Sequence, residues 1–360
     1  MQQTNMKEGE MGDQESFPMT GGDGEYSYTK NSSPQKRAAD RAKPMLAEAI
    51  GENLDIVPGS PTKSISIADL GCSVGNNTFI AVKNIIEAIQ EKYQKQGHTS
   101  SPLEFQVFFS DHASNDFNLL FLSLPTDRQY FVCGVPGSFY TRLFPKASLN
   151  VIHCSSALHW LSKVPPELGD LKSPCCNREK IFYANAPKEI GEAYAAQYER
   201  DMETFLGARA QELAPGGLMV LLISGRISGT LPGKSSLGPQ FEPLESSLVD
   251  MANEGIISKD KLALFNLPMY SPSPEEIEKI IERNGNYIAK KIEKMPDRTF
   301  GLFKKQECRA GFEALIKAHF GSEILDELFD RYEAKVTGRP PPGVAEGIGM
   351  GIFILLKRKQ

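Results

Sequence analysis

The sequence predicts an α/β fold: a doubly wound, mostly parallel sheet with helices on both faces and a helical cap. Short apolar segments alternate along the chain with longer helical segments, and this order pairs consecutive strands in parallel. The first strand runs directly into a glycine-rich turn that opens a helix, a connection that binds ligands in open α/β sheets. A chain of 360 residues is long enough for one such domain with a smaller cap.

The first half of the chain follows this alternation element by element. A helix is expected where spaced apolar residues follow Pro34, because proline is tolerated in the first turn of a helix. The turn GCSVGNNT then separates an apolar strand from a long helix, and Asp111 ends the next strand. The predicted elements are a helix over 33–53, a strand over 64–70, a helix over 79–96, and strands over 104–111, 129–135 and 148–156.

The second half continues the sheet and then leaves the alternation. Gly216 and Gly217 supply a turn between a helix and an apolar strand, and Gly321 breaks a pair of helices further on. The predicted elements are a helix over 193–214, a strand over 216–226, a loop-rich segment over 226–250 that passes into helices through about 285, a helical pair over 308–336, and a last strand over 351–359 in the same sheet.

These elements predict the domain boundaries. The helices after the fifth strand do not fit the alternation, so they are expected to form a cap over one edge of the sheet. The start of the chain is polar and acidic, which favours a disordered lead-in. The expected division is a lead-in over 1–25, a core over 26–225 together with 345–360, and a mainly helical cap over 226–344.

Composition and charge argue against several classes of function. The net charge of −5 and the pI near 5.7 disfavour a nucleic-acid surface, which needs clustered lysine and arginine. No apolar run approaches the roughly 20 residues that span a bilayer, and 1–25 lack the apolar centre of a signal peptide. The six cysteines match no disulfide framework or zinc site, so reduced thiols are expected. The prediction is a soluble cytoplasmic protein with no nucleic-acid or membrane partner.

Successive strand ends carry groups that suit one cofactor. Asp69 lies at the end of the first strand, and Gly71 and Gly75 follow in a G-x-x-x-G spacing that lets a ligand approach the backbone. An acid at this place would repel a pyrophosphate, but it suits the ammonium and sulfonium groups of S-adenosylmethionine. Asp111 ends the second strand, where it suits two ribose hydroxyls, and Phe139 follows the third strand as a surface for adenine.

Each of these positions also has a purely structural interpretation. Asp69 can belong to an ordinary strand-to-helix turn, Asp111 can cap a turn, and Phe139 can be a core residue. A nicotinamide oxidoreductase is a further alternative, disfavoured by the G-x-x-x-G spacing beside an acid. The occurrence of all three groups at successive strand ends, in this order, favours a methyltransferase.

The chain resembles the plant SABATH methyltransferases, which methylate salicylate, benzoate and theobromine. The resemblance runs from about Pro18 to the C-terminus and rests on PMTGGDGEYSYTKNSSPQ, DLGCSVGNNT, VPGSFYTRLFP, SSALHWLSKVP and ARAQELAPGGLMVLLISGR. It implies a class I methyltransferase core, which is Rossmann-like, a helical cap that encloses the acceptor, and a homodimer. It also implies methyl transfer from S-adenosylmethionine to a small-molecule carboxylate that is aromatic, terpenoid or jasmonate-like.

The resemblance also assigns cofactor contacts. Tyr28 falls in the N-terminal segment that the family folds over the cofactor, and His112 is expected to act through its backbone. Resemblance and spacing together predict a cofactor-binding set of Tyr28, Ser32, Asp69, Gly71, Asn77, Asp111, His112, Ser138 and Phe139.

Four residues are predicted to bind the acceptor. Gln35 and Trp160 match the pair whose amide and indole N–H groups hold the acceptor carboxylate, and both donate without carrying charge. His159 is expected to contact the acceptor, although a histidine at a strand end is also often a core residue. Ser156 stands where the family usually has Tyr or Phe, so it is expected to enlarge the pocket or to place a donor in it.

The family often binds magnesium away from the chemistry, and the resemblance places this ion at Asn177, Phe265 and Asn266. Ala263 stands where the family usually has Asp, and hard cations prefer carboxylate oxygen.

No catalytic nucleophile or acid–base pair is predicted, because a carboxylate is already an anion near neutral pH and needs only to be positioned. The alternatives are N-methylation of a xanthine or other alkaloid, and a homologue that binds S-adenosylmethionine without catalysis. The presence of both Gln35 and Trp160 favours the carboxylate.

Overall fold

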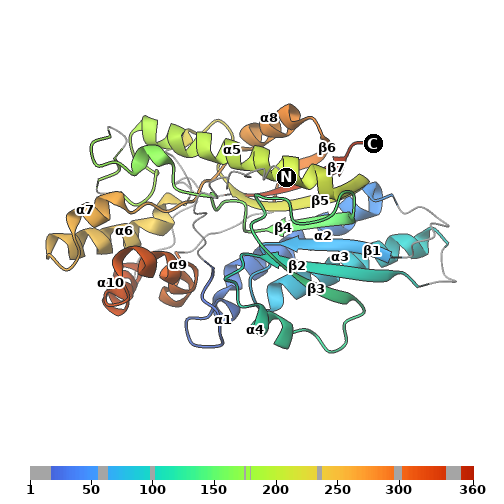
Figure 1. Ribbon diagram of the computed structural model, residues 1–360, viewed down its shortest axis with the longest axis horizontal. Helices are drawn as coiled ribbons and strands as arrows, with labels where there is room; N and C mark the ends of the chain where they lie inside the picture. The colour runs from blue at the N-terminus through green and yellow to red at the C-terminus, as the bar shows by residue number, and fades with distance from the viewer. Residues whose placement is uncertain are drawn as a thin grey trace, which may run out of the picture.

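The computed structural model has the predicted α/β architecture, built on one seven-stranded sheet (Figure 1). It describes residues 18–55, 64–97, 102–173, 176–178, 180–232, 237–295, 302–337 and 350–360. The strands are β1 (Ser64–Leu70), β2 (Glu104–Asp111), β3 (Phe131–Pro136), β4 (Leu149–Ser155), β5 (Leu213–Gly225), β6 (Tyr287–Lys294) and β7 (Met350–Arg358). The α-helices are α1 (Tyr28–Asn31), α2 (Ser33–Asn53), α3 (Asn76–Lys95), α4 (Phe117–Leu122), α5 (Lys188–Glu212), α6 (Gly238–Asn253), α7 (Lys259–Leu264), α8 (Pro274–Asn284), α9 (Lys305–Phe320) and α10 (Leu325–Val336).

The strand order is β3-β2-β1-β4-β5-β7-β6, and β1 to β5 pair in parallel as predicted. The chain runs from β1 to β2 on one side, while β4 lies on the other side of β1. Ligands bind at such a switch point in open α/β sheets, outside the carboxyl ends of the strands. The last strand joins the same sheet as predicted, and it pairs antiparallel with both β5 and β6.

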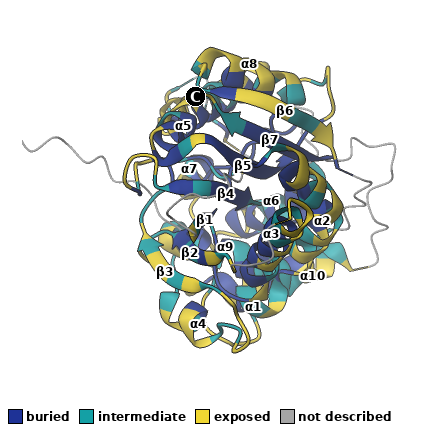
Figure 2. Cartoon of the chain, turned by 90° about the vertical axis from the view of Figure 1, so that its right-hand side faces the viewer, coloured by how far each residue is buried: buried dark blue, intermediate teal, exposed yellow. Residues whose placement is uncertain are grey.

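Alternating side chains of the strands build a core on each face of the sheet. Ile67 of β1 and Val151 of β4 belong to the core that contains the buried side chains of α2 and α3. The next residues along these strands, Ala68 and Ile152, belong to the core on the face of α5. Figure 2 shows the inner strands as a buried centre, whereas the edge strands β3 and β6 and the outer sides of the helices carry exposed residues.

The long helix α5 covers its face of the sheet because its buried residues recur at helical spacing. Most of them are apolar or aromatic, and they form one stripe that faces the core: Ile190, Tyr194, Tyr198, Met202 and Phe205.

One strand was not expected from the sequence. Residues 226–344 were predicted to form a mainly helical cap, but β6 lies within this range and pairs with β7 at the edge of the sheet. The helix before it, α8, lies beside α5 on the sheet (Figure 1). The sequence therefore did not predict this strand, and the range 226–344 is helical in its other described elements. The helices α6, α7, α9 and α10 gather at one end of the molecule, where the sequence predicted a cap (Figure 1).

The predicted disordered lead-in is also wrong for its described part. We call residues 18–28 the N-terminal strap. The Thr20 amide donates to the Ala310 carbonyl of α9 at 3.0 Å, and the Gly22 amide donates to Asp116 Oδ2 at 3.1 Å. The guanidinium of Arg309 lies 4.1 Å from the centre of the Tyr26 ring. The strap therefore joins α9 to the turn before α4, and residues 1–17 lie outside the described residues.

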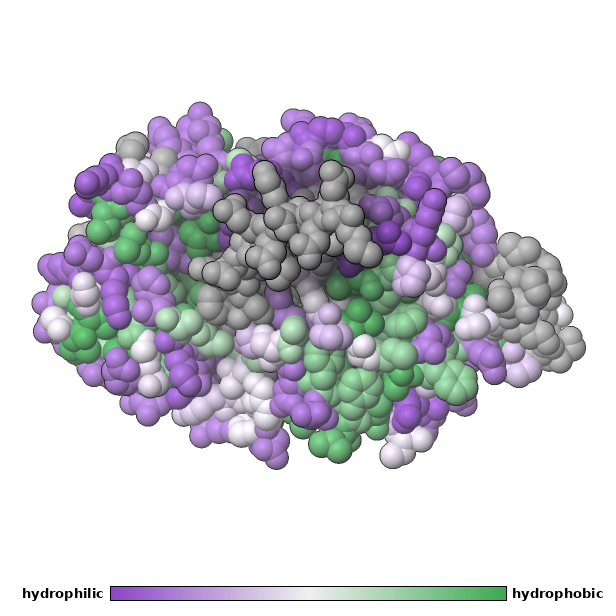
Figure 3. Space-filling model, viewed as in Figure 1, coloured by the Kyte–Doolittle hydropathy of each residue, from purple (hydrophilic) through white to green (hydrophobic). Residues whose placement is uncertain are grey.

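The surface is mostly hydrophilic on the face shown in Figure 3, with apolar side chains gathered near α4. Leu122 of α4 and Phe131 of β3 are among the exposed large apolar residues. Among the helices in the described ranges, none combines the length and the apolar character that crossing a membrane requires. None of the described cysteines forms a disulfide with another described residue: Cys72, Cys133, Cys154, Cys176 and Cys308.

Candidate functional site

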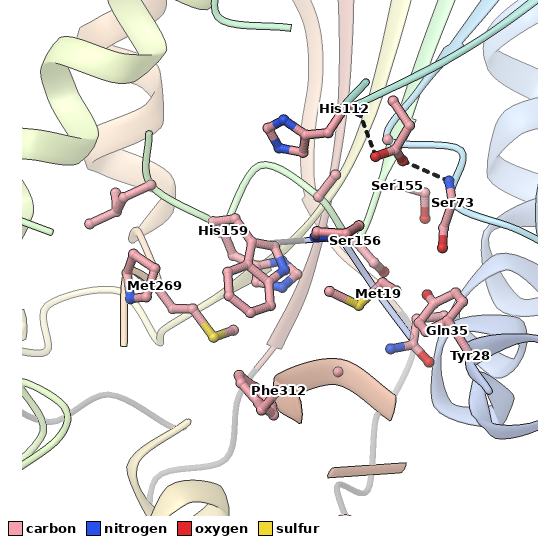
Figure 4. Close-up of a pocket in the computed structure, with 18 of the residues that line it drawn as sticks. Met19, Tyr28, Gln35, Ser73, His112, Ser155, Ser156, His159, Met269 and Phe312 are labelled. Carbon is pink, nitrogen blue, oxygen red and sulfur yellow. Dashed lines mark hydrogen bonds between the residues drawn. The ribbon is translucent and has the colours of Figure 1, made fainter. Parts of the chain in front are cut away.

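A cavity lies at the carboxyl ends of β1, β2 and β4, next to the switch point of the sheet (Figure 4). Its empty volume is about 1180 Å³ when the space open to solvent is counted. Ligands bind at this place in open α/β sheets, so the cavity is the candidate site for both cofactor and acceptor.

The structure brings most of the predicted residues together around this one cavity. Five predicted cofactor residues line it: Tyr28, Gly71, Asp111, His112 and Phe139. All four predicted acceptor residues line it as well: Gln35, Ser156, His159 and Trp160. Figure 4 shows Tyr28 and Gln35 on one side of the space, and His159 and Met269 on the other.

The turn after β1 requires glycine where it approaches the turn after β4. Gly71 has a φ of +75°, and a Cβ atom placed on it would lie 2.5 Å from the Cβ of Ala157. A side chain in this left-handed backbone conformation is disfavoured. The Gly71 amide donates to the Ser110 carbonyl at 2.8 Å, which fixes the turn against β2. The backbone is therefore open to a ligand at this point.

Asp111 is held by the backbone on both carboxylate oxygens. The Ser73 amide donates to Oδ2 at 2.7 Å, and the His112 amide donates to Oδ1 at 2.8 Å (Figure 4). Burial raises the pKa of Asp111, although these two N–H groups act in the opposite direction. Burial also raises the pKa of the nearby Tyr28 hydroxyl, and the charge of Asp111 adds to this shift. Tyr28 is therefore neutral near neutral pH.

Asp69 lies behind the cavity wall instead of on it. Its side chain is buried, accepts a hydrogen bond from Thr78 Oγ1, and lies 2.6 Å from His153 Nδ1. These contacts tie the end of β1 to the first turn of α3 and to β4. His153 of β4 is buried at this contact.

Three further predicted cofactor residues lie outside the lining of the cavity. The Asn77 side chain donates from Nδ2 to the Ser32 carbonyl at 3.1 Å, so these two residues bind each other. Ser138 Oγ accepts from the Tyr140 amide at 3.2 Å in the turn after β3.

The acceptor side is built on a short pairing between distant segments. Trp160 forms an isolated antiparallel bridge with Met269. The Leu161 amide donates to the Pro268 carbonyl at 2.7 Å, and the Trp160 ring centre lies 5.5 Å from that of Phe312. Sequence analysis did not single out Pro268 and Met269, because nothing local in the sequence indicates their contact with Trp160.

Two oxygens in the cavity lining are buried without a hydrogen bond in the part of the chain that the structure describes. Gln35 Oε1 and Ser73 Oγ are both buried, and neither has a hydrogen-bond partner within the described residues. A buried polar atom without a partner costs free energy, so these atoms fit a site that a polar ligand completes. The strap supplies Pro18 and Met19 to the same lining, which its polar composition did not predict.

The three residues predicted to hold magnesium lie together but do not suit the ion. Asn177 Nδ2 donates to Asn266 Oδ1 at 3.1 Å, which uses an amide oxygen that a cation would need. Phe265 directly follows α7, and Ala263 offers no carboxylate. Across the described residues, no group of three His, Cys, Asp or Glu side chains is placed to hold a metal. Because Mg²⁺ is usually bound through carboxylates, this donor set does not fit it.

Known proteins are similar to this chain over most of its length. Residues 14–359 match the family model described as SAM dependent carboxyl methyltransferase. The chain is 45% identical to a loganic acid O-methyltransferase of Catharanthus roseus, over 88% of this chain and 87% of that protein. It is 38% identical to a farnesoic acid carboxyl-O-methyltransferase of Arabidopsis thaliana, over 95% of this chain and 99% of that protein. A solved structure of a loganic acid methyltransferase with SAH is similar with a TM-score of 0.88 and 42% identity, covering 95% of this chain and 99% of that one.

Proposed function

The chain belongs to the family of S-adenosylmethionine-dependent carboxyl methyltransferases, and we propose that its acceptor is a cyclic terpenoid acid of the loganic acid kind. Membership of this family makes the protein an enzyme that forms methyl esters of small acids. The observation that carries the acceptor proposal is its similarity to loganic acid methyltransferases over most of the chain. The mixed lining of the acceptor side supports it, since serine hydroxyls and His159 face apolar walls from Met269 and Phe312.

We propose that the cofactor occupies the side of the cavity next to β1, β2 and β3. Gly71 leaves room at the backbone, and Asp111 would accept hydrogen bonds from ribose hydroxyls through the lone pairs that its backbone contacts leave unused. Phe139 would present its ring to adenine, while Tyr28 covers the site from the strap. Ser32, Asp69, Asn77 and Ser138 would support this side through their contacts behind it.

We propose that the acceptor carboxylate lies between Gln35 and Trp160. The amide of Gln35 and the indole N–H of Trp160 are donors without charge. They would orient the carboxylate without neutralising it, so that one oxygen keeps its negative charge for the reaction. His159 and Ser156 would contact the rest of the acceptor, and apolar residues would close the pocket around it.

The methyl transfer requires little from the side chains beyond this orientation of the acceptor carboxylate. When bound, S-adenosylmethionine supplies a methyl group on a sulfonium: the acceptor oxygen bonds to the methyl carbon as the carbon–sulfur bond breaks, leaving a neutral thioether. A carboxylate is ionised near neutral pH, so no side chain has to remove a proton. The residues of the cavity have to hold the two reacting atoms at about 3–3.5 Å and in line.

A transfer assay with labelled S-adenosylmethionine tests the proposal. The purified protein is offered loganic acid beside farnesoic, jasmonic, gibberellic and benzoic acids, with a xanthine as the nitrogen acceptor. We expect label in a product that mild base hydrolyses, formed fastest from the cyclic terpenoid acid. Transfer of label to the xanthine, in a product that mild base does not hydrolyse, would contradict ester formation. Faster transfer to the linear farnesoic acid or to the benzoate would contradict the acceptor class.

Three expectations from the sequence remain proposals about the protein as a whole. We propose a homodimer, which light scattering after size-exclusion chromatography tests, and a cytoplasmic location, which cell fractionation tests. We also propose that α6, α7, α9 and α10 act as a cap distinct from the sheet, which hydrogen exchange with and without ligand tests.

A further inference from the structure

A buried ion pair near the end of α5 lies behind the cofactor side of the cavity. The side chains of Arg209 and Glu212 are both fully buried, with 0% exposed. Arg209 Nε donates to Glu212 Oε2 at 2.6 Å, and its terminal NH2 group donates to Oε1 at 2.9 Å. Replacing a buried ion pair by apolar residues is often neutral for stability, so stability alone is a weak reason for this pair.

The other hydrogen bonds of Arg209 and Glu212 are made to one loop. We call residues 139–144, which follow β3, the platform loop. Arg209 donates to the carbonyls of Phe139 at 2.5 Å and Thr141 at 2.7 Å. Glu212 Oε1 accepts from the amides of Leu143 and Phe144, at 2.5 Å and 3.0 Å. A cation therefore binds the carbonyls at the start of the loop, and an anion binds the amides at its end.

This loop sets part of the cavity wall. It brings Phe139 to the lining, where only 9% of the residue is exposed. The Phe139 ring packs edge-on against Phe205 of α5, with 6.0 Å between ring centres. β3 lies at one edge of the described sheet, so no further strand of this sheet holds the loop from outside. The Tyr140 hydroxyl donates to the Trp160 carbonyl at 2.6 Å, which links the loop to the acceptor side.

We propose that Arg209 and Glu212 are positioning residues for cofactor binding, which hold the platform loop so that Phe139 presents a fixed face to adenine. The proposal rests on the proposed function, because it takes Phe139 as a cofactor contact. Arginine suits this role because its planar fork reaches Glu212 and two carbonyls at once. Lysine keeps the charge but carries all its donors on one nitrogen, so it cannot hold both carbonyls in the same geometry.

The first test is Arg209→Lys, with the affinity for S-adenosylhomocysteine measured by calorimetry in the absence of acceptor. We expect the Kd to rise about tenfold, together with a lower Tm. The matched control is Arg226→Lys at the end of β5. Arg226 is also buried and donates to Glu276 Oε2 at 2.7 Å, and its guanidinium also donates to Thr230, Tyr270 and Ser271, outside the platform loop. We expect a lower Tm in this control as well, with a Kd unchanged within about twofold.

A double-mutant cycle with Phe139→Leu then asks whether Arg209 acts through Phe139. If it does, the double variant binds S-adenosylhomocysteine no more weakly than the weaker single variant, within about twofold. Additive losses would overturn the proposal, and so would an unchanged Kd in Arg209→Lys or an equal rise in the Arg226→Lys control. Any of these three results would leave the pair as a structural feature without a specific effect on cofactor binding.

Glu212→Gln provides a second variant, which carries the test if Arg209→Lys does not fold. It keeps the shape and one carbonyl oxygen for the loop amides but removes the charge that fixes Arg209. We expect the Kd to rise about threefold. An unchanged Kd would overturn the proposal. Wild-type protein that does not bind S-adenosylhomocysteine would count against the proposed function itself, whereas tight wild-type binding with unchanged variants would overturn only this inference.

Discussion

One added methyl group after β1 should destabilise the turn that carries the cofactor site. In Gly71→Ala the new Cβ would lie 2.5 Å from the Cβ of Ala157, well inside contact distance, while Phe139 Cε1 at 3.7 Å makes an ordinary contact. The left-handed backbone conformation costs about 1–2 kcal/mol for a residue with a side chain. Forcing the two turns apart adds about 1–3 kcal/mol. We therefore expect the free energy of unfolding to fall by about 2–5 kcal/mol.

A second substitution separates the two causes. Ala157→Gly removes the atom that the new methyl group meets, so Gly71→Ala/Ala157→Gly should retain only the backbone cost. We expect the double variant to recover at least about 1 kcal/mol of the loss, because residues in contact are not additive. Cofactor affinity should recover with it, since Gly71 lines the cavity.

Urea denaturation measures the stability of each variant, and calorimetry with S-adenosylhomocysteine measures the binding. Gly207→Ala is the matched control, because it lies in α5 and nothing lies within 4 Å of a Cβ placed there. This control should be neutral or stabilising by about 0.5–1 kcal/mol. The reasoning would be refuted if Gly71→Ala were as stable as the control, or if Ala157→Gly recovered nothing.

Three further predictions concern the two sides of the cavity and the metal. Trp160→Phe removes one indole donor to the acceptor carboxylate, a bond worth about 1.5–3 kcal/mol, so kcat/KM for the acid should fall about 10- to 150-fold. The Kd for S-adenosylhomocysteine should stay the same, and an equal loss in both quantities would contradict the assignment. Burial raises the pKa of Asp111, so this acid becomes neutral at a higher pH than an ordinary Asp, whose pKa is about 3.9. As the pH is lowered, cofactor affinity should therefore begin to fall at a higher pH than the protonation of an ordinary Asp would cause. If the affinity of Asp111→Asn depended on pH as strongly as that of the wild-type protein, this prediction would be contradicted. Removing divalent ions with EDTA should leave the initial rate unchanged, because Asn177, Phe265 and Asn266 supply no carboxylate for magnesium. A rate that EDTA abolishes and only magnesium restores would contradict this.

Much of the fold was predictable where local pattern and tertiary structure agree. The strand Ser64–Leu70 and the helix Ser33–Asn53 have the bounds that their apolar spacing predicts. Gly71 was predictable because a turn between a parallel strand and a helix at this place needs a backbone without a side chain. The groups at successive strand ends predicted three residues of one cavity side, Gly71, Asp111 and Phe139, and the family resemblance added Tyr28 and His112.

The rest depends on contacts that no local pattern contains. β6 (YIAKKIEK) is rich in charge because it is an edge strand, so its sequence does not show the apolar alternation of the inner strands. The strap is polar, yet the Thr20 amide bonds to the Ala310 carbonyl, a partner far along the chain. Arg209 illustrates the same limit, since its partners are backbone carbonyls about 70 residues earlier in the chain.

Asp69 marks the difference between predicting a site and predicting its geometry. Its place before the glycine turn suggested direct contact with the cofactor. The structure directs its carboxylate to Thr78 and His153, behind the cavity. The alternation of side chains along β1 explains this, because Asp69 faces the same side of the sheet as Ile67, toward α2 and α3.

The central claim is that one cavity holds the cofactor and the acceptor carboxylate side by side. A crystal structure of the protein with S-adenosylhomocysteine and the best acid from the transfer assay tests it most directly. The account predicts adenine against Phe139, ribose hydroxyls on Asp111, and the carboxylate between Gln35 and Trp160 with one oxygen directed at the sulfur. A carboxylate bound away from these two residues, or a cofactor bound outside the β1–β2–β3 side, would contradict it.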